Sequence, residues 1–181
     1  MRYQLEIKLT EEDYLQFNLF QAFELPHSKK AMQKSRLTFL GVVVLLLAVY
    51  IWIAGATPFS IVYSLVMCLI TTIYLAYYKK LVARNIRKQI KKLCKTGKLP
   101  FDENSVIQFY EDRIVETAAS SRIEKGYEAL ERICVLGDCY ILLFTSSVAA
   151  YILPMPQVKA QIDMQDFLSF LSGKCDTVEY H

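Results

Sequence analysis

The hydrophobic residues of this chain concentrate in one run of 42 consecutive positions without Asp, Glu, Lys, Arg or His. A helix needs about 20 apolar residues to cross the hydrocarbon core of a bilayer, so the run holds two spans, at residues 37–56 and 59–78. Gly55 and Pro58 interrupt helical structure between them. The pattern predicts a transmembrane hairpin with a short tip, because the rest of the chain is too short to surround it as a soluble core.

Basic residues flank this hairpin at its two chain ends and are missing from its tip. Four precede the first span and eight follow the second. Because Lys and Arg near the ends of a span favour the cytoplasmic side, we expect a multi-pass protein of the cell membrane with both termini in the cytoplasm. The polar N-terminal segment does not have the pattern of a signal peptide, so the first span is expected to be an internal anchor.

The second span carries small and hydroxyl-bearing residues at helical spacing. They are Ser60, Ser64, Cys68, Thr71 and Thr72. Such residues let helices approach closely and share hydrogen bonds. Two interpretations stay open: ordinary packing on the first span, or a pore-lining face in a homo-oligomer. The span contains no acid, base or histidine, which gives little support to proton or ion transport.

A strongly basic segment follows the hairpin at residues 79–98, with nine basic residues and no acidic one. Helical periodicity places most of its charges on one face and its apolar residues on the other. The charged face is a candidate site for anionic lipids, or a solvated face of a helix that packs on the soluble domain. A third interpretation, nucleic-acid binding, is disfavoured, because aromatic residues are not interleaved with the charges and no known nucleic-acid-binding fold is recognisable. The candidate lipid-contact residues are Lys80, Arg84, Arg87, Lys88, Lys91, Lys92 and Lys95.

The remaining sequence predicts an α+β domain. Residues 2–9 alternate apolar and polar side chains, which indicates a half-buried strand, and Thr10 caps a following helix. Several short strands come after the basic segment, and a helix at 157–171 closes the domain. The tail from residue 172 is expected to be loose. The predicted later strands are 105–110, 113–117, 122–126, 131–136, 139–145 and 148–153, and they suggest a small antiparallel sheet or partly open barrel.

These patterns divide the chain into five segments. The predicted segments are an N-terminal strand and helix packing with the soluble domain (1–36), the hairpin (37–78), the basic helix (79–98), the β domain (99–172) and the tail (173–181). The β domain with its tail has a net charge of −7, from thirteen acidic and six basic residues. We expect the first strand to pack against or pair with the later sheet, because its apolar face is too small to be buried alone.

Reactive motifs are missing from the sequence. The two histidines, His27 and His181, have no partner at metal-ligand spacing, so no metal site is predicted. The five cysteines are expected to be free thiols, although Cys134 and Cys139 flank a turn at Gly137 and could face each other across a hairpin. No phosphate-binding or nucleophile motif occurs. The sequence therefore predicts neither an enzyme nor a cofactor.

The order of these features resembles the YcxB-like family of bacterial membrane proteins. The resemblance covers most of the chain and includes the segment TEEDYLQFN, the hairpin and the basic residues after it. In the β domain it includes Tyr127, Ile133, residues 140–144 with the sequence YILLF, and residues 150–154 with the sequence AYILP. It implies a pleckstrin-homology-like (PH-like) domain, which is a curled antiparallel sheet capped by a C-terminal helix, and it brings no catalytic residues.

Two function classes follow from the sequence. The first is a membrane-anchored, non-enzymatic interaction or sensing module whose cytoplasmic domain binds an unidentified protein, peptide or lipid. The second is an oligomeric membrane-active or transport-related subunit that acts through the hairpin. The first class places function in the soluble domain, and the second places it in the polar stripe of the second span.

Overall fold

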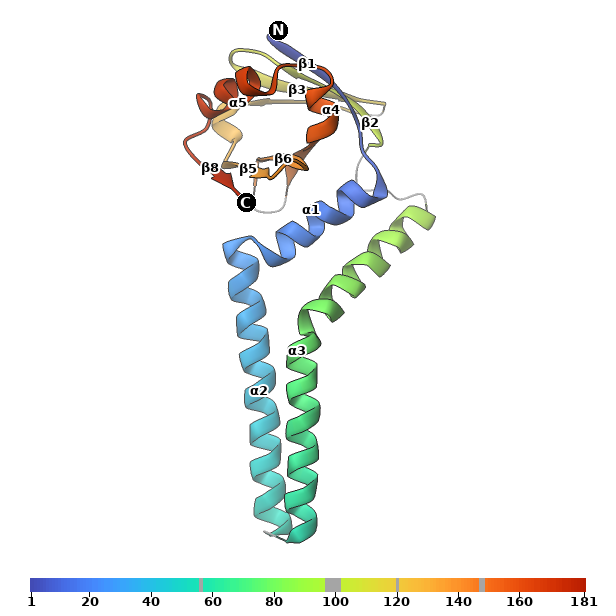
Figure 1. Cartoon of the computed structure of the whole chain (residues 1–181), viewed down its shortest axis with the longest axis vertical. Coiled ribbons are helices and arrows are strands. Elements are labelled where there is room, and N and C mark those ends of the chain that lie inside the picture. Colours follow the sequence, from blue (N-terminus) through green and yellow to red (C-terminus); the bar gives the residue numbers. More distant parts are fainter. Residues whose placement is uncertain (56, 97–101, 120, 147–148) are drawn as a thin grey trace. The chain divides into compact units, whose positions relative to one another are not determined.

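The computed structural model describes residues 1–55, 57–96, 102–119, 121–146 and 149–181. These residues form two units (Figure 1). One unit contains Met1–Phe17 and Ile90–His181, and the other contains Asn18–Gln89. We call the first the two-sheet unit and the second the helical unit. Four positions lie outside the described residues: Ala56, Gly97, where a glycine is expected to end the basic helix, residue 99 as the predicted start of the β domain, and Val148 as a predicted strand start.

The first sheet of the two-sheet unit, sheet A, has four antiparallel strands in sequence order. The strands are β1 (Tyr3–Lys8), β2 (Asn104–Phe109), β3 (Arg113–Ala118) and β4 (Arg122–Gly126). The pairing of β1 with β2 places Leu5 opposite Ile107. Alternation along β1 buries Leu5 and Ile7 and exposes the polar residues between them. The predicted pairing of the first strand with the later sheet is thereby confirmed.

The second sheet, sheet B, has the strand order β7-β6-β5-β8. Gly137, with a φ of +48°, lies in the predicted turn between β5 and β6. A short 3₁₀ helix, η1 (Tyr127–Ala129), connects the two sheets along the chain. The strands are β5 (Arg132–Leu136), β6 (Tyr140–Phe144), β7 (Ala150–Pro154) and β8 (Val178–Tyr180). The first three are antiparallel, and β8 lies parallel to β5.

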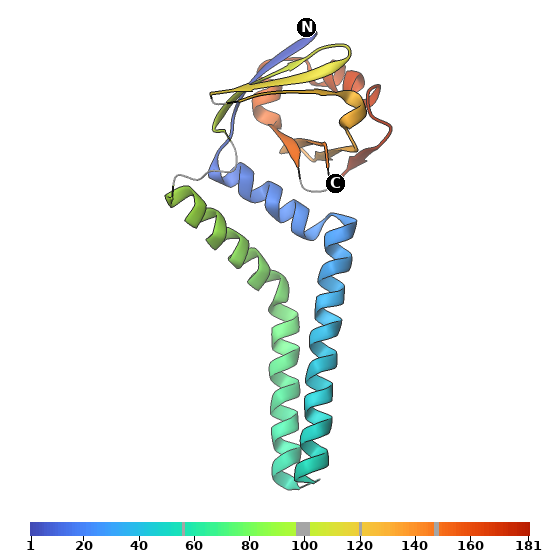
Figure 2. The same cartoon turned by 180° about the vertical axis from the view of Figure 1, so that it is seen from behind.

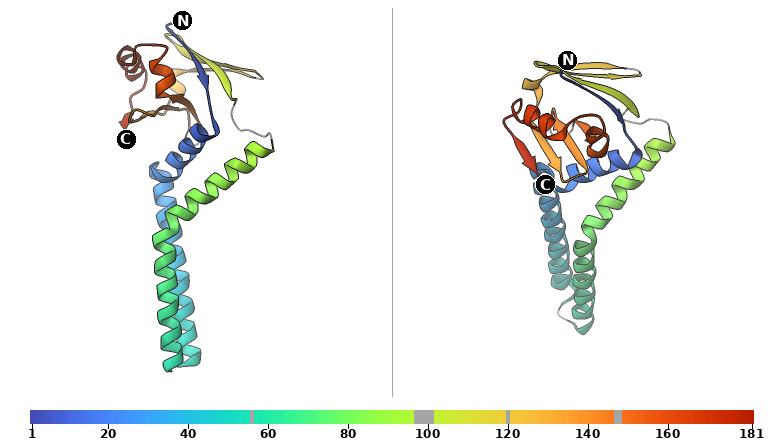
Figure 3. Two further views of the ribbon diagram at one scale, coloured as in Figure 1. Left: turned by 45° about the vertical axis from the view of Figure 1, so that its right-hand side comes forward. Right: turned by 45° about the horizontal axis from the view of Figure 1, so that its top comes forward.

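The C-terminal tail is ordered, so the prediction of a loose tail is wrong. The backbone N–H of Ile133 donates to the carbonyl of Thr177 at 2.9 Å, and the N–H of His181 donates to the carbonyl of Val135 at 2.9 Å. Val178 packs against the core between these bonds. Cys175, which belongs to the core, and Val178 hold the tail together with the edge of β5, and Figure 3 shows the tail in red beside the orange strands.

The predicted single helix at 157–171 is also wrong, because the segment forms two helices. These are α4 (Met155–Lys159) and α5 (Met164–Ser172). The carboxylate of Asp163 accepts a hydrogen bond from the backbone N–H of Asp166 at 2.9 Å and so caps a new helix. The predicted strand end at residue 153 lies one residue before Pro154, the last residue of β7.

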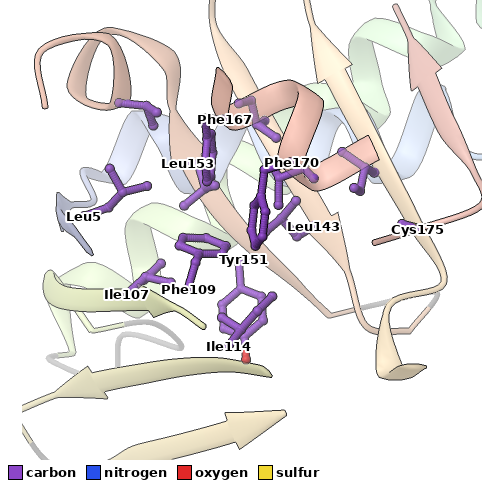
Figure 4. Packing of buried hydrophobic residues seen from close by; sticks show 14 of the residues in the cluster. Leu5, Ile107, Phe109, Ile114, Leu143, Tyr151, Leu153, Phe167, Phe170 and Cys175 are labelled. Atoms are coloured by element: carbon purple, nitrogen blue, oxygen red, sulfur yellow. The ribbon is translucent and has the colours of Figure 1, made fainter. Parts of the chain in front are cut away.

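The core of the two-sheet unit lies between the inner faces of the two sheets and α5 (Figure 4). The ring of Phe167 on α5 packs edge-on against Phe109 of β2 at 5.0 Å and against Tyr3 of β1 at 5.2 Å. The α+β class and the antiparallel strands are therefore confirmed. The described strands form two separate sheets and do not close into a barrel.

The outer face of sheet B is covered by the first turns of α1 (Glu11–Phe23). Thr10 caps this helix as predicted, since its hydroxyl accepts the N–H of Asp13 at 3.2 Å. Phe17 packs on Phe144 with ring centroids 6.0 Å apart, and the hydroxyl of Tyr140 donates to Asp13 at 2.8 Å. The three antiparallel strands of sheet B, β5 to β7, are consequently buried on both faces.

Two glutamine side chains from the α4 region bond to the free edge of β1. The backbone N–H of Glu6 donates to Oε1 of Gln161 at 2.8 Å, and Nε2 of Gln161 donates back to the Glu6 carbonyl at 2.9 Å. Gln157 makes the same two bonds with Lys8, each at 2.8 Å. These bonds fix the segment after β7 to the N-terminal strand.

The helical unit contains two long helices that run side by side (Figures 1 and 2). They are α2 (Pro26–Ala54) and α3 (Pro58–Lys95), of which the unit includes α3 up to Gln89. The predicted second span and the predicted basic helix are thus one continuous helix of 38 residues. Both helices are long and apolar enough to cross a membrane. No side chain in the most apolar stretch of α2 is buried, unlike the side chains of a core helix.

Aromatic and polar contacts join the two helices. Tyr50 lies 4.8 Å from Tyr63, and Phe39 lies 4.6 Å from Tyr74, between ring centroids. At the tip the hydroxyl of Ser60, which is buried, donates to the carbonyl of Gly55 at 2.7 Å. The other hydroxyls of the predicted stripe donate to carbonyls four residues back in α3, at 2.8 to 2.9 Å.

Candidate functional site

A cavity of about 350 Å³ lies in the two-sheet unit, where the inner face of sheet A meets β7 of sheet B. This volume is near the lower end of the range for small-molecule pockets. Apolar side chains line part of the wall, and polar ones line the rest. The apolar residues include Leu9, Phe17, Ile107, Ile123 and Ile152, and the polar ones include Asp102, Ser105, Glu116, Lys125, Thr145 and Tyr151.

Tyr151 is the most unusual residue of this lining. Only 7% of it is exposed, and its hydroxyl has no hydrogen-bond partner among the described residues. Burial raises the pKa of the phenol to about 12, and the nearby Glu116 adds to the shift. An unpaired buried hydroxyl costs about 1–3 kcal/mol. The cavity thus contains one polar group that a ligand can satisfy.

Glu116 supplies the nearest charge. It lies on β3 between Ile107 of β2 and Ile123 of β4 in the strand register. Burial raises the pKa of this carboxyl, and the charge of Asp102 raises it further, whereas Ser105 and Lys125 act in the opposite direction. A cationic group brought into the cavity would therefore stabilise the ionised form of Glu116.

Lys125 closes one side of the site. Its ammonium group donates to the hydroxyl of Thr145 at 3.1 Å and so joins β4 of sheet A to the end of β6 in sheet B. With one ammonium and two carboxylates, from Asp102 and Glu116, the cavity lining has an excess of negative charge. This balance favours a ligand with a cationic or hydrogen-bond-donating end.

The residues predicted to contact lipid lie elsewhere, on α3. All seven are exposed, and none of them forms an ion pair with another described residue. Lys80, Arg84, Arg87 and Lys88 belong to the helical unit, and Lys91, Lys92 and Lys95 belong to the two-sheet unit. They are accessible as the sequence predicts, and they take no part in the cavity.

Sequence reasoning missed the cavity because its residues come from strands that only the fold brings together. One signal was available. Ile114 and Glu116 are two residues apart on β3 and so point to the same face, and Ile114 on that face belongs to the core between the sheets. A charged residue at an inward position is uncommon without a partner or a function.

The positions of the cysteines and histidines agree only in part with the sequence prediction. All five cysteines are free, as predicted. Cys134 is opposite Leu142 in the β5–β6 register and does not face Cys139. His181, for which no metal-ligand partner was predicted, lies near Cys134 and Glu179, and these three form the one group of metal-ligating side chains found among the described residues.

Comparison of the chain with family models, with characterised proteins and with solved structures finds no match. The resemblance to the YcxB-like family stays a prediction.

Proposed function

We propose that this chain is a membrane-anchored, non-enzymatic binding module. In this proposal α2 and the apolar part of α3 span the cell membrane, both termini are cytoplasmic, and the two-sheet unit binds a small ligand. The antiparallel strands followed by α5 support a PH-like, YcxB-like domain. The observation that carries the binding function is the buried hydroxyl of Tyr151 in a cavity between the sheets, which has no hydrogen-bond partner in the part of the chain that the structure describes.

The membrane part of the proposal is supported by exposed apolar side chains. Leu45, Leu46 and Ile53 on α2 are 62–74% exposed, and Leu65 on α3 is 66% exposed. In water these surfaces would be unfavourable, whereas hydrocarbon accepts them. Labelling a single cysteine at Thr57 from outside intact cells tests the topology. A label that reaches Thr57 only after the cells are opened contradicts it.

The basic residues of α3 are proposed to contact anionic headgroups. Each basic residue close to such a surface contributes about 1 kcal/mol. The full chain in bilayer discs with and without anionic lipid provides the test, with retained lipid measured by mass spectrometry. Changing Arg84, Arg87, Lys88, Lys91 and Lys92 to Gln is expected to remove the preference for anionic lipid. An unchanged preference means that these side chains are only solvated.

The ligand part of the proposal is a small amphipathic amine. Its apolar body would contact residues such as Phe17 and Ile107, and its ammonium group would pair with Glu116 and donate a hydrogen bond to the hydroxyl of Tyr151. Glu116 and Asp102 outnumber Lys125 in the lining, which favours a cation over an anion. A cavity of about 350 Å³ accommodates a ligand of roughly the size of a substituted aromatic amine.

The test uses 3-phenylpropylamine as the probe and 3-phenylpropan-1-ol as its neutral isostere, with the full chain in detergent. Saturation-transfer NMR is expected to detect the amine and not the alcohol. Glu116→Gln and Tyr151→Phe should each weaken amine binding about fivefold or more, in line with the loss of a charged or buried hydrogen bond. Glu124→Gln is the matched control on the neighbouring strand. Equal binding of the two probes, or equal loss in the control, overturns the proposal.

The alternative function, an oligomer acting through the hairpin, has less support. The hydroxyls of Ser64, Thr71 and Thr72 are bonded to carbonyls of their own helix. Ser60 and Thr71 are buried. A pore would instead need these groups to face a water-filled lumen.

A further inference from the structure

The outer face of sheet B carries a cluster of three metal-ligating side chains at the junction of β5 and β8. Cys134 is paired with Glu179 in the parallel register of these strands. His181 follows Glu179 by two positions and so points to the same face of the extended chain. One ligand atom from each of Cys134, Glu179 and His181 lies within 4.8 Å of the others.

Two of the distances in this cluster match those between ligands of a tetrahedral zinc ion. Sγ of Cys134 lies 3.6 Å from Oε2 of Glu179, and Nε2 of His181 lies 3.3 Å from the same oxygen. Zinc bonds of about 2.0–2.1 Å to oxygen and nitrogen and about 2.3 Å to sulfur, at tetrahedral angles, separate the ligand atoms by about 3.3–3.6 Å. The third pair, Sγ of Cys134 and a ring nitrogen of His181, lies within 4.8 Å, so a shift of the His181 side chain can bring all three ligand atoms to zinc distance.

The backbone holds two of these ligands in register with the third. The N–H of His181 donates to the carbonyl of Val135, and its carbonyl accepts the N–H of Gly137 at 3.1 Å. These bonds fix the last residue of the cluster to β5 and to the turn that follows it. Cys134 is fully buried, whereas the side chains of Glu179 and His181 are about one-third exposed. An ion can approach from the side on which Glu179 and His181 are exposed, and the thiol of Cys134 already lies beside them.

We infer that Cys134, Glu179 and His181 form a zinc-binding site that fastens the C-terminal strand to sheet B. The combination of one sulfur, one nitrogen and one oxygen ligand is suited to zinc, and hard cations such as magnesium prefer oxygen alone. Binding releases the thiol proton of Cys134 to solvent as the sulfur–zinc bond forms. A solvent molecule completes the four positions. The inference is independent of the proposed amine site, which lies where sheet A meets β7.

The test is a titration of the reduced, metal-free full chain in detergent with Co²⁺, followed by displacement with Zn²⁺. The expected result is one Co²⁺ per chain, with a thiolate-to-cobalt charge-transfer band and the strong visible absorption of a four-coordinate site. Zn²⁺ should abolish both signals and raise the thermal midpoint. Cys134→Ser should remove the charge-transfer band, and His181→Ala should weaken Zn²⁺ binding at least tenfold.

Matched controls separate this site from adventitious binding. Cys139→Ser changes an exposed cysteine in the neighbouring turn, and His27→Ala changes the other histidine, so neither should alter the spectrum or the affinity. His181→Ala alters a side chain that is about one-third exposed and not in the core, which keeps the test valid if Cys134→Ser fails to fold. The inference is overturned if the parent chain shows no charge-transfer band, or if Cys139→Ser removes it as Cys134→Ser does.

Discussion

The two-sheet unit and the helical unit are both rich in large apolar residues, but they place them in opposite environments. Phe109, Phe144 and Phe167 in the two-sheet unit are 0% exposed, whereas Leu46 in the helical unit is 62% exposed and Trp52 is 85% exposed. The first unit removes apolar surface from water by packing it on itself. The helical unit leaves apolar side chains of the same kind exposed, so that they contact whatever surrounds the chain. Apolar content alone therefore says little about where a segment resides, and the distribution of charges says more.

The largest effect is expected from removing a core aromatic ring of the two-sheet unit. Phe167→Ala should lower the free energy of unfolding of this unit by about 3–5 kcal/mol, because it leaves a cavity against Phe109 and Tyr3. Limited proteolysis in increasing urea measures the change. Leu46→Ala in α2 is the matched control and should leave this midpoint unchanged. Equal losses in the two variants would show that the two units are not energetically distinct.

A charge in the hairpin tests the other half of the comparison. Leu46→Lys should disfavour membrane insertion by about 3–4 kcal/mol, because lysine at the centre of a span is strongly unfavourable and leucine is favourable. The share of the chain that resists alkaline extraction from membranes measures the effect. Tyr180→Lys, at a position 72% exposed in the two-sheet unit, should not change it. Normal extraction resistance of Leu46→Lys argues against a membrane span.

Alkaline pH should destabilise the two-sheet unit through Tyr151. Burial raises the pKa of Tyr151 from 10.0 to about 12, so the folded state keeps the phenol proton that the unfolded chain loses first. The stability that this pKa difference contributes is fully present below pH 10. The free energy of unfolding then falls by roughly 2 kcal/mol as the pH rises to about 12.

Thermal unfolding of Tyr151→Phe and of the parent, from about pH 9 to about pH 12, checks this expectation. The variant should lose less stability over that range. Tyr180→Phe is the control, and it should follow the parent because Tyr180 is largely exposed. Parallel curves for Tyr151→Phe and the parent would mean that the phenol is not in the environment described.

The smallest effect is expected at the edge of β1. Gln161→Ala removes two hydrogen bonds to Glu6, but water can replace them, so the loss should be about 1 kcal/mol. Gln16→Ala removes a side-chain bond to Glu12 within α1 and should change stability by less than about 0.5 kcal/mol. Urea denaturation of both variants measures the difference. A loss at Gln161 no larger than at Gln16 would show that the edge contacts contribute nothing.

Local patterns in the sequence predicted most elements of the fold. Alternation in β1 and the capping residue Thr10 needed only neighbouring residues, and both predictions are confirmed. The order of the tail was missed, because β8 has few residues and forms only through pairing with β5, more than 40 positions away. The helix start at Asp163 was not predicted, because the spacing of apolar residues suggests one helix that continues across this position.

The sites were harder to predict than the elements. The basic residues of α3 are accessible, as their helical periodicity indicated. The sequence around them does not show whether they contact lipid or only solvent. Glu116 and Tyr151 are 35 positions apart in the chain and share a cavity only because the sheets meet there. Cys134 and His181 lie close together only because the tail forms β8 beside β5. Long-range pairing is not visible in one sequence without its structure.

The turn between α2 and α3 has a consequence for how the hairpin enters a bilayer. Ser60 donates to the Gly55 carbonyl, and the N–H of Gly55 donates to Ile51 at 2.9 Å. For the span proposed above, this turn has to traverse the hydrocarbon during biogenesis, where each unpaired backbone group costs several kcal/mol. A turn that carries its own hydrogen bonds and no charge lowers that translocation barrier. The two helices can therefore cross together, with the closed turn as the leading end.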